Sequence, residues 1–428
     1  MSRSGLSVLT RIGFVVGALV LLPGCDDYTY TRFVAPPWPD SDPWEQFVYA
    51  TCDTDCTTAV SWRALAVAPL VGPAGAQSDN SLAVDGRGRV HASYPVVSYH
   101  YRNLEYATCA AGCDSSGAGA WQTVIVDRAN VYGQTSLHVD GTERVHVSYH
   151  GGNSGDYGLK YATCAGPCTT PGDWKRVLVD SVDVFAGFHQ SGYASLAVDR
   201  SGRIHVVDPS VFGESPHFLQ VLKYATCAAD CGTRANWATT IVDGPHPDTS
   251  GSLTFSSLEV DGTGRLHVSS GGGMSGLRYA TCSVDCGTAA SWQTVTVSGS
   301  ARAGRYAALA ADGIGRVHIS SYDERGALLY ASCQADCAAA VNWHVVIVDV
   351  PGSWGWGTAV AVDDAGRIHL VYDGTAGLKY ATCAANCAAA GNWRVASVRG
   401  PSSTGIPSTT SLAVDTRGRV HVGYHRRF

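Results

Sequence analysis

The chain has 428 residues, of which 45% are apolar and 15% charged, with a formal net charge of −6 at pH 7. This length is ample for a sizeable core, and the modest charge, with no basic run of more than a few residues, argues against a nucleic acid partner. The 49 glycines are typical of many short strands and tight turns, so no helical domain is needed.

Residues 1–25 have the pattern of a secretory signal: two arginines, then an apolar run over 12–22 that is too short to cross a membrane as a helix. The run ends in Leu-Pro-Gly-Cys and resembles a bacterial lipobox, which implies that Cys25 is the lipidated N-terminus of the mature protein. An ordinary signal peptide with a chance cysteine is the alternative. We expect an exported protein, lipid-anchored to a membrane of the bacterial cell envelope, with the Pro-rich residues 26–46 as a semi-rigid tether.

From residue 47 onward the sequence repeats three landmarks seven times. Tryptophans lie at 62, 121, 174, 237, 292, 343 and 393, each shortly after a Cys-x-x-x-Cys pair. Arg-x-His is the third landmark, and its histidines are 91, 146, 205, 267, 318, 369 and 421. Successive tryptophans are 50 to 63 residues apart, a period close to that of propeller blades and too long for leucine-rich or ankyrin repeats.

One complete repeat, residues 360–398, contains four short apolar runs bounded by Gly, Asp or Asn, so it predicts four antiparallel strands. The first copy starts midway, at 47–52, with strands three and four. The last copy stops midway, with strands one and two at 411–415 and 419–424. Two half-units complete a seventh unit only if the chain ends meet. The sequence therefore predicts an all-β, seven-bladed β-propeller over 47–428, with four antiparallel strands per blade and a two-plus-two strand clasp.

The cysteines also indicate export. Without Cys25, fourteen remain, in seven pairs of identical spacing, which predicts seven local disulfides in an oxidising compartment. The pairs are Cys52 with Cys56, Cys109 with Cys113, Cys164 with Cys168, Cys227 with Cys231, Cys282 with Cys286, Cys333 with Cys337 and Cys383 with Cys387. Metal binding is the alternative, but two cysteines and the nearby histidine lack the fourth ligand of a structural zinc site. We expect no metal and no cofactor.

The repeated polar residues are interpreted as structural. Each first hairpin reads Asp-x-x-Gly-Arg, except that Glu143 replaces the glycine once. Such an Asp accepts hydrogen bonds from backbone N–H groups of its own turn, and Gly supplies the positive φ. We expect the seven histidines to be hydrogen-bonded core residues and the seven tryptophans to pack between blades.

The strings SLAVDxxGRVH and LKYATC…W…VD resemble the sialidase-like, BNR-type repeats of bacterial exported propellers, over nearly all of residues 47–428. The resemblance implies the propeller fold. Sialidases of this kind carry Ser-x-Asp-x-Gly-x-Thr-Trp boxes, an Arg-Ile-Pro segment, an arginine triad and a Tyr/Glu pair. Here no Arg-Ile-Pro occurs and no triad can be assigned, so no catalytic residue is carried over.

In such a blade, the loops joining strands 1–2 and 3–4 emerge on one face, which we call the turn face. Loops 2–3 and the connections between blades emerge on the other, the connection face, where the seven copies differ in length and content. Variable loops on a rigid scaffold are where binding usually occurs. Our candidate ligand-binding residues are aromatic side chains of these loops: Tyr99, Tyr101, Phe188, Tyr193, Trp354 and Trp356.

The function we predict is a lipid-anchored, monomeric binding module of the cell envelope, with a glycan or another envelope protein as its partner. A glycan hydrolase or lyase is the alternative, with its site in the variable loops and with single carboxylates as acid and base. Asp156, Glu214, Asp323 and Glu324 are examples, and no spacing favours any pair of them. A scaffold without a small ligand remains a third hypothesis.

Overall fold

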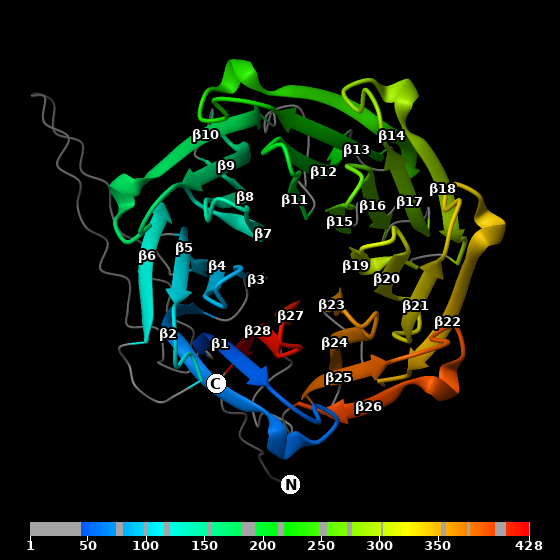
Figure 1. Cartoon of the computed structure of the whole chain (residues 1–428). Coiled ribbons are helices and arrows are strands. Elements are labelled where there is room, and N and C mark those ends of the chain that lie inside the picture. The colour runs from blue at the N-terminus through cyan, green and yellow to red at the C-terminus, as the bar shows by residue number, and fades with distance from the viewer. Residues whose placement is uncertain are drawn as a thin grey trace, which may run out of the picture. The chain divides into compact units, whose positions relative to one another are not determined.

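The computed structural model describes residues 44–73, 80–97, 102–114, 120–152, 156–181, 193–212, 218–248, 255–271, 276–300, 303–351, 357–374, 377–398 and 408–427. The unit formed by residues 42–428 is an all-β, seven-bladed propeller, as the repeats predict (Figure 1). Every blade is a four-stranded antiparallel sheet. None of the helices in the described ranges is long and apolar enough to cross a membrane.

Six blades, which we name B to G, are each built from four consecutive strands. Blade B has β3 (Ser81–Val84), β4 (Val90–Val97), β5 (Arg102–Cys109) and β6 (Trp121–Asp127). Blade C has β7 (Tyr132–Val139), β8 (Val145–Gly151), β9 (Gly158–Cys164) and β10 (Trp174–Ser181). Blade D has β11 (Ser195–Val198), β12 (Ile204–Phe212), β13 (Phe218–Cys227) and β14 (Ala238–Asp248).

Blade E has β15 (Phe255–Val260), β16 (Leu266–Gly271), β17 (Leu277–Cys282) and β18 (Gln293–Ser298). Blade F has β19 (Arg305–Ala311), β20 (Val317–Tyr322), β21 (Leu328–Cys333) and β22 (Trp343–Asp349). Blade G has β23 (Thr358–Val362), β24 (Ile368–Gly374), β25 (Gly377–Cys383) and β26 (Arg394–Ser397). Short 3-10 helices precede fourth strands: η1 (Ala59–Ser61), η2 (Pro171–Asp173), η3 (Arg234–Asn236), η4 (Ala289–Ser291), η5 (Ala340–Asn342) and η6 (Ala390–Asn392).

Blade A closes the ring with strands from both ends of the chain. Its strand order is β2 (Arg63–Pro73), β1 (Trp44–Cys52), β28 (Val420–Arg427) and β27 (Ser408–Val414). Strands β1 and β28 pair without interruption from Glu45 opposite Arg427 to Cys52 opposite Val420. The two-plus-two clasp is therefore present, and β1 begins three residues before the expected boundary at residue 47. In Figure 1 the red C-terminal strands lie beside the blue β1.

A chain of hydrogen bonds repeats within the blades on the side of the turn face. In blade E, Asp261 accepts at Oδ1 from the backbone N–H groups of Thr263 (2.8 Å) and Arg265 (3.0 Å). Its Oδ2 lies 3.2 Å from Nε2 of His267, whose Nδ1 lies 2.8 Å from the hydroxyl of Tyr279. Burial lowers the pKa of His267 and raises that of Tyr279 to about 12, so both are neutral at pH 7. The tyrosine then donates to the histidine, and the histidine donates to the aspartate.

The same tyrosine connects each blade to the next one. Its ring contacts the following blade's tryptophan with centroids 4.9–5.4 Å apart at all seven interfaces, including the one closed by the clasp. In six copies the indole N–H donates to the carbonyl of the second cysteine of its pair, at 2.8–3.1 Å. These contacts confirm the structural interpretation of the repeated Asp, His and Trp residues.

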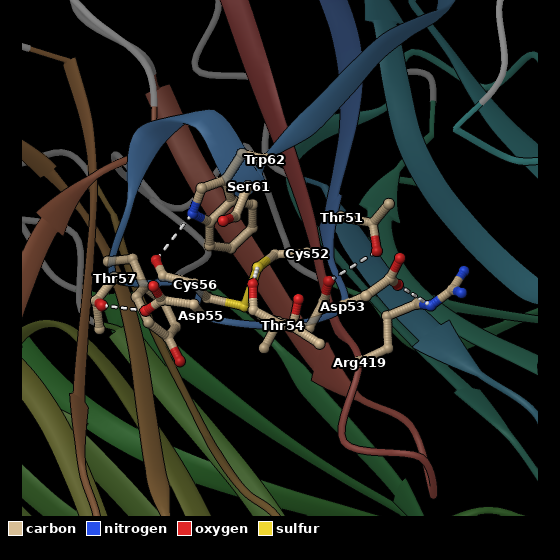
Figure 2. Close-up of a disulfide and its surroundings, with 12 residues drawn as sticks. Thr51, Cys52, Asp53, Thr54, Asp55, Cys56, Thr57, Ser61, Trp62 and Arg419 are labelled. Carbon is tan, nitrogen blue, oxygen red and sulfur yellow. Dashed lines mark hydrogen bonds and ion pairs between the residues drawn. A yellow bond between two sulfur atoms is a disulfide. The ribbon is translucent and has the colours of Figure 1, made fainter.

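The disulfide prediction is also confirmed, because all seven Cys-x-x-x-Cys pairs are bonded, with Cα atoms 5.7–5.8 Å apart. Figure 2 shows the copy in blade A, where Trp62 donates to the carbonyl of Cys56 (3.0 Å) beside the Cys52–Cys56 bond. The enclosed loop is not a helical turn. In this copy Asp55, directly before the second cysteine, has a φ of +49°, a left-handed conformation that reverses the chain.

Candidate functional site

The propeller axis holds a cavity of about 210 Å³. Its wall comes from the innermost strand of every blade: β3, β7, β11, β15, β19, β23 and β27, which surround the axis in Figure 1. Each of these strands runs from the connection face toward the turn face, so the residues at its start lie at the connection-face end of the cavity. Most of the lining is polar, with hydroxyl, amide and backbone groups from unlike blades.

Serine hydroxyls of the innermost strands join neighbouring blades along the cavity wall. In four of the five blades that carry serine at the first position of the Ser-Leu-Ala-Val string, this serine accepts a hydrogen bond from the leucine N–H in the next blade. The bonds measure 2.9–3.0 Å and join Leu137 to Ser81, Leu196 to Ser136, Leu258 to Ser195, and Leu309 to Ser257. The fifth serine, Ser411, donates to Oδ1 of Asn80. The strand edges facing the axis are thus partly satisfied by hydroxyl groups of the neighbouring blade.

Two titratable side chains reach the cavity from positions that are alanine in the other five blades. Glu259 on β15 and His138 on β7 each stand two residues after the serine of their strand. Glu259 lines the cavity, and desolvation by the surrounding protein raises the pKa of its carboxyl to about 7. Burial lowers the pKa of His138 to about 4, so this imidazole is neutral at pH 7. The described lining contains no lysine or arginine.

An aromatic cluster borders the cavity near the connection face. Tyr193, Phe255 and Tyr306 come from blades D, E and F, each two residues before the first residue of the Ser-Leu-Ala-Val string. The ring centroid of Phe255 lies 4.3 Å from the ring centroid of Tyr193 and 4.0 Å from that of Tyr306. Phe255 and Tyr306 line the cavity and are each 8% exposed. They offer hydrophobic ring surface on one side of an otherwise polar wall.

Ion pairs cross four of the blade interfaces within the described residues, on the side of the connection face. An aspartate at the end of one blade's fourth strand meets a lysine or arginine on the third strand of the next, at 2.6–3.5 Å. The pairs are Asp127 with Lys160, Asp180 with Lys223, Asp243 with Arg278, and Asp349 with Lys379. Since these charges are already paired and lie on outer strands, we interpret them as contacts between blades rather than ligand groups.

Among the six candidate residues, Tyr193 is the one that the structure describes. Its ring is 3% exposed and packs on Phe255, while its backbone carbonyl accepts from the hydroxyl of Ser256 at 2.7 Å. Tyr193 therefore supports the cavity lining rather than offering a free face. The other five, Tyr99, Tyr101, Phe188, Trp354 and Trp356, and the lipidation candidate Cys25, lie outside the described residues.

The sequence interpretation missed the residues that line the axial cavity itself. Glu259, His138 and Phe255 stand inside strands, whereas our search was directed at loops. Aligning the seven copies on the Ser-Leu-Ala-Val string reveals Glu259 and His138, because each interrupts a column of alanines. The column of Phe255 holds mixed residues and gives no such signal. The alternative carboxylates Asp156, Asp323 and Glu324 do not belong to the cavity lining that the structure describes, and Glu214 lies outside the described residues.

The cavity's chemistry suits hydrogen bonding and stacking. Within the described ranges, no group of three or more His, Cys, Asp or Glu side chains is arranged to hold a metal ion. One carboxyl, one neutral imidazole, several hydroxyls and two aromatic rings surround a space of small-molecule size. Such a wall can orient a neutral polar ligand, with Glu259 as its acceptor or acid.

No protein-family model and no curated protein matches this sequence. Among solved structures, the polysaccharide lyase Uly1 is similar at 10% identity and a TM-score of 0.48, over 82% of this chain and 91% of that one. A PL25 ulvan lyase is similar at 9% identity and a TM-score of 0.47, over 75% and 78%. A mutant of the NanB sialidase from Streptococcus pneumoniae is similar at 9% identity and a TM-score of 0.47, over 90% and 94%. At these identities the likeness concerns the propeller fold alone.

Proposed function

We propose that this protein is a binding module of the bacterial cell envelope that takes part of a glycan into the axial cavity from the connection face. The observation that carries the proposal is the composition of the cavity wall. Hydroxyl and amide groups surround the space, and Phe255 and Tyr306 cover one side of it. Sugars present the complementary surfaces, because their hydroxyls exchange hydrogen bonds and their C–H faces stack on aromatic rings.

A glycan array probed with the purified protein, followed by calorimetry on any ligand found, tests this function. Phe255→Leu keeps an apolar side chain in place but removes the ring, and we expect it to weaken binding about tenfold or more. Ile314→Leu is the matched control, because Ile314 is 79% exposed on the turn face and its replacement leaves the cavity untouched. Absence of binding to any glycan, or equal affinity of the Phe255→Leu variant, would refute the proposal.

A glycan hydrolase or lyase is a second candidate function, favoured by Glu259. A carboxyl with its pKa raised to about 7 is poised to give or take a proton near neutral pH. If the protein turns over a glycan, Glu259→Gln should abolish product formation while retaining the fold. Binding without product over long incubation would leave the binding module as the function.

The membrane anchor is a separate part of the proposal and is supported by the lipobox-like end of residues 12–25. Lipidation of Cys25 would hold the propeller at a membrane surface, within reach of envelope glycans. Mass spectrometry of the N-terminal peptide should find a diacylglyceryl group on Cys25, and Cys25→Ala should release the protein from the membrane fraction. An unmodified peptide starting at another residue would overturn the anchor.

A further inference from the structure

The serine ring of the axial cavity is interrupted on one side. Five blades carry serine at the first position of the string, whereas blades F and G carry Ala308 and Ala359. Both alanines belong to the cavity lining. At the four blade junctions named above, the serine hydroxyl accepts a hydrogen bond from the backbone N–H of the leucine in the next blade's string. The two alanines have no hydroxyl with which to do this.

Two backbone N–H groups lose their acceptor as a result. In blade F, Ala308 occupies the position from which a serine would accept the backbone N–H of Val360 in blade G. In blade G, Ala359 occupies the position from which a serine would accept the backbone N–H of Leu412 in blade A. Val360 pairs with Leu370 on the second strand of its blade, as the equivalent Leu137 pairs with Val147. Because the register is the same, the N–H of Val360 points away from its own sheet, as the N–H of Leu137 does. Within the described part of the chain, neither N–H meets a side-chain acceptor. A polar backbone group left without a partner favours a ligand or water in that place.

Glu259 supplies an acceptor beside this gap. It stands two residues after Ser257 on β15, and alternate residues of a strand point to the same side. Because Ser257 reaches blade F to accept from Leu309, Glu259 also projects toward blade F, where the gap begins. The sector from blade E to blade A thus combines one carboxylate acceptor, two N–H donors and the small side chains of two alanines. An amide group has the inverse pattern, with one N–H, one carbonyl oxygen and, in an acetamido group, one methyl.

We propose that this sector binds the acetamido group of an N-acetylated sugar, an inference that rests on the glycan-binding function above. The carbonyl oxygen accepts from the N–H of Val360 or Leu412, and the amide N–H donates to Glu259. The methyl group occupies the space that serine hydroxyls would fill at Ala308 and Ala359. The missing serines are therefore the specificity determinant of the cavity.

The test compares two neutral oligosaccharides, chitotriose and cellotriose, which differ at position 2 of each sugar by an acetamido group against a hydroxyl. We expect chitotriose to bind at least about tenfold more tightly, because two hydrogen bonds distinguish the ligands. Saturation-transfer NMR should show the strongest transfer to the acetamido methyl.

The decisive variant places serines at the two positions where the serine ring is interrupted. Ala308→Ser with Ala359→Ser should leave the melting temperature unchanged or higher and weaken chitotriose binding about tenfold or more. Ala83→Ser, the same change on β3 outside this sector, should leave the affinity unaltered. Equal binding of both oligosaccharides, or unchanged chitotriose affinity in the double variant, would overturn this inference while leaving a glycan-binding function standing. Absence of binding to any glycan would overturn both.

Discussion

The two faces of this propeller use the same seven repeats in different ways. Toward the turn face, the blades repeat one set of contacts, from the aspartate of the first hairpin through histidine and tyrosine to the next blade's tryptophan and its disulfide loop. In five blades Nε2 of the histidine forms a hydrogen bond of 3.1–3.4 Å with the aspartate. Toward the connection face, equivalent positions hold unlike residues, such as Tyr94, Asp208 and Ser270 on the second strands. The repeated contacts hold the ring together, and this leaves the other face free to vary.

The largest expected effect concerns the clasp, on which both faces depend. Deleting residues 411–428 removes β28 and most of β27, so the edge of β1 loses its partner and buried residues of β1 such as Val48 lose their contacts. We expect loss of cooperative unfolding and aggregation, measured by calorimetry and light scattering. Deletion of Phe428 alone is the control. A long truncation that melts at the wild-type temperature would show that closure does not stabilise the ring.

In blade G, two adjacent aspartates allow the effect of the repeated contacts to be compared with the effect of removing a surface charge. Asp363 accepts from the backbone N–H groups of Ala365 (3.0 Å) and Arg367 (2.8 Å), and its Oδ2 lies 3.2 Å from Nε2 of His369. Asp363→Ala should lower the free energy of unfolding by about 2 kcal/mol or more, because the buried His369 and two N–H groups of the turn lose their acceptor. The neighbouring Asp364 is exposed, so Asp364→Ala should change it by less than about 0.5 kcal/mol. Similar losses in chemical denaturation for the two variants would contradict this role.

Acidic pH should lower the stability of the propeller, because its seven repeated histidines are buried in the neutral form. Burial lowers the pKa of each, to about 4 for His318, whose partner Asp312 is also held by Arg316. A lowered folded-state pKa means that the unfolded chain binds protons first. Stability is therefore complete above the unfolded value of about 6.5 and falls as the pH drops from there toward 4. Melting temperatures should be flat from pH 8 to 7 and decline by several degrees by pH 5, and a flat profile across this range would refute the assignment of neutral histidines.

The smallest effect concerns the one turn that departs from the repeat. Glu143 occupies the glycine position with a φ of +65°, and its carboxylate pairs with the exposed Arg87 of the previous blade at 2.6 Å. Glu143→Gly should raise the free energy of unfolding by about 1 kcal/mol, because glycine adopts this conformation without strain and an exposed ion pair contributes little. Arg87→Ala, which removes the pair alone, is the control. A destabilised glycine variant would mean that the ion pair outweighs the strain.

The fold was predictable because each repeated residue reports a contact that every blade makes. Seven tryptophans in fixed phase, or seven paired cysteines, constrain the local structure strongly, and the half-repeats at the two ends required closure. The cavity was harder to predict, since it is formed by the convergence of seven strands that are distant in sequence. Glu259 and His138 are single departures within those strands, and their shared environment exists only once the ring has closed. Loop composition directed the prediction to aromatic residues, of which Tyr193 alone lies in the described part.

The division of roles between the faces can be tested most directly by measuring affinity and melting temperature on the same two variants. Phe255→Leu alters the cavity near the connection face, and Asp363→Ala alters a turn. With a glycan found on the array, we predict that Phe255→Leu weakens binding about tenfold with a small change in melting temperature. Asp363→Ala should lower the melting temperature and leave the affinity of the folded protein unchanged. Loss of affinity in a folded Asp363→Ala protein, with Phe255→Leu binding normally, would place the site on the turn face and contradict the account.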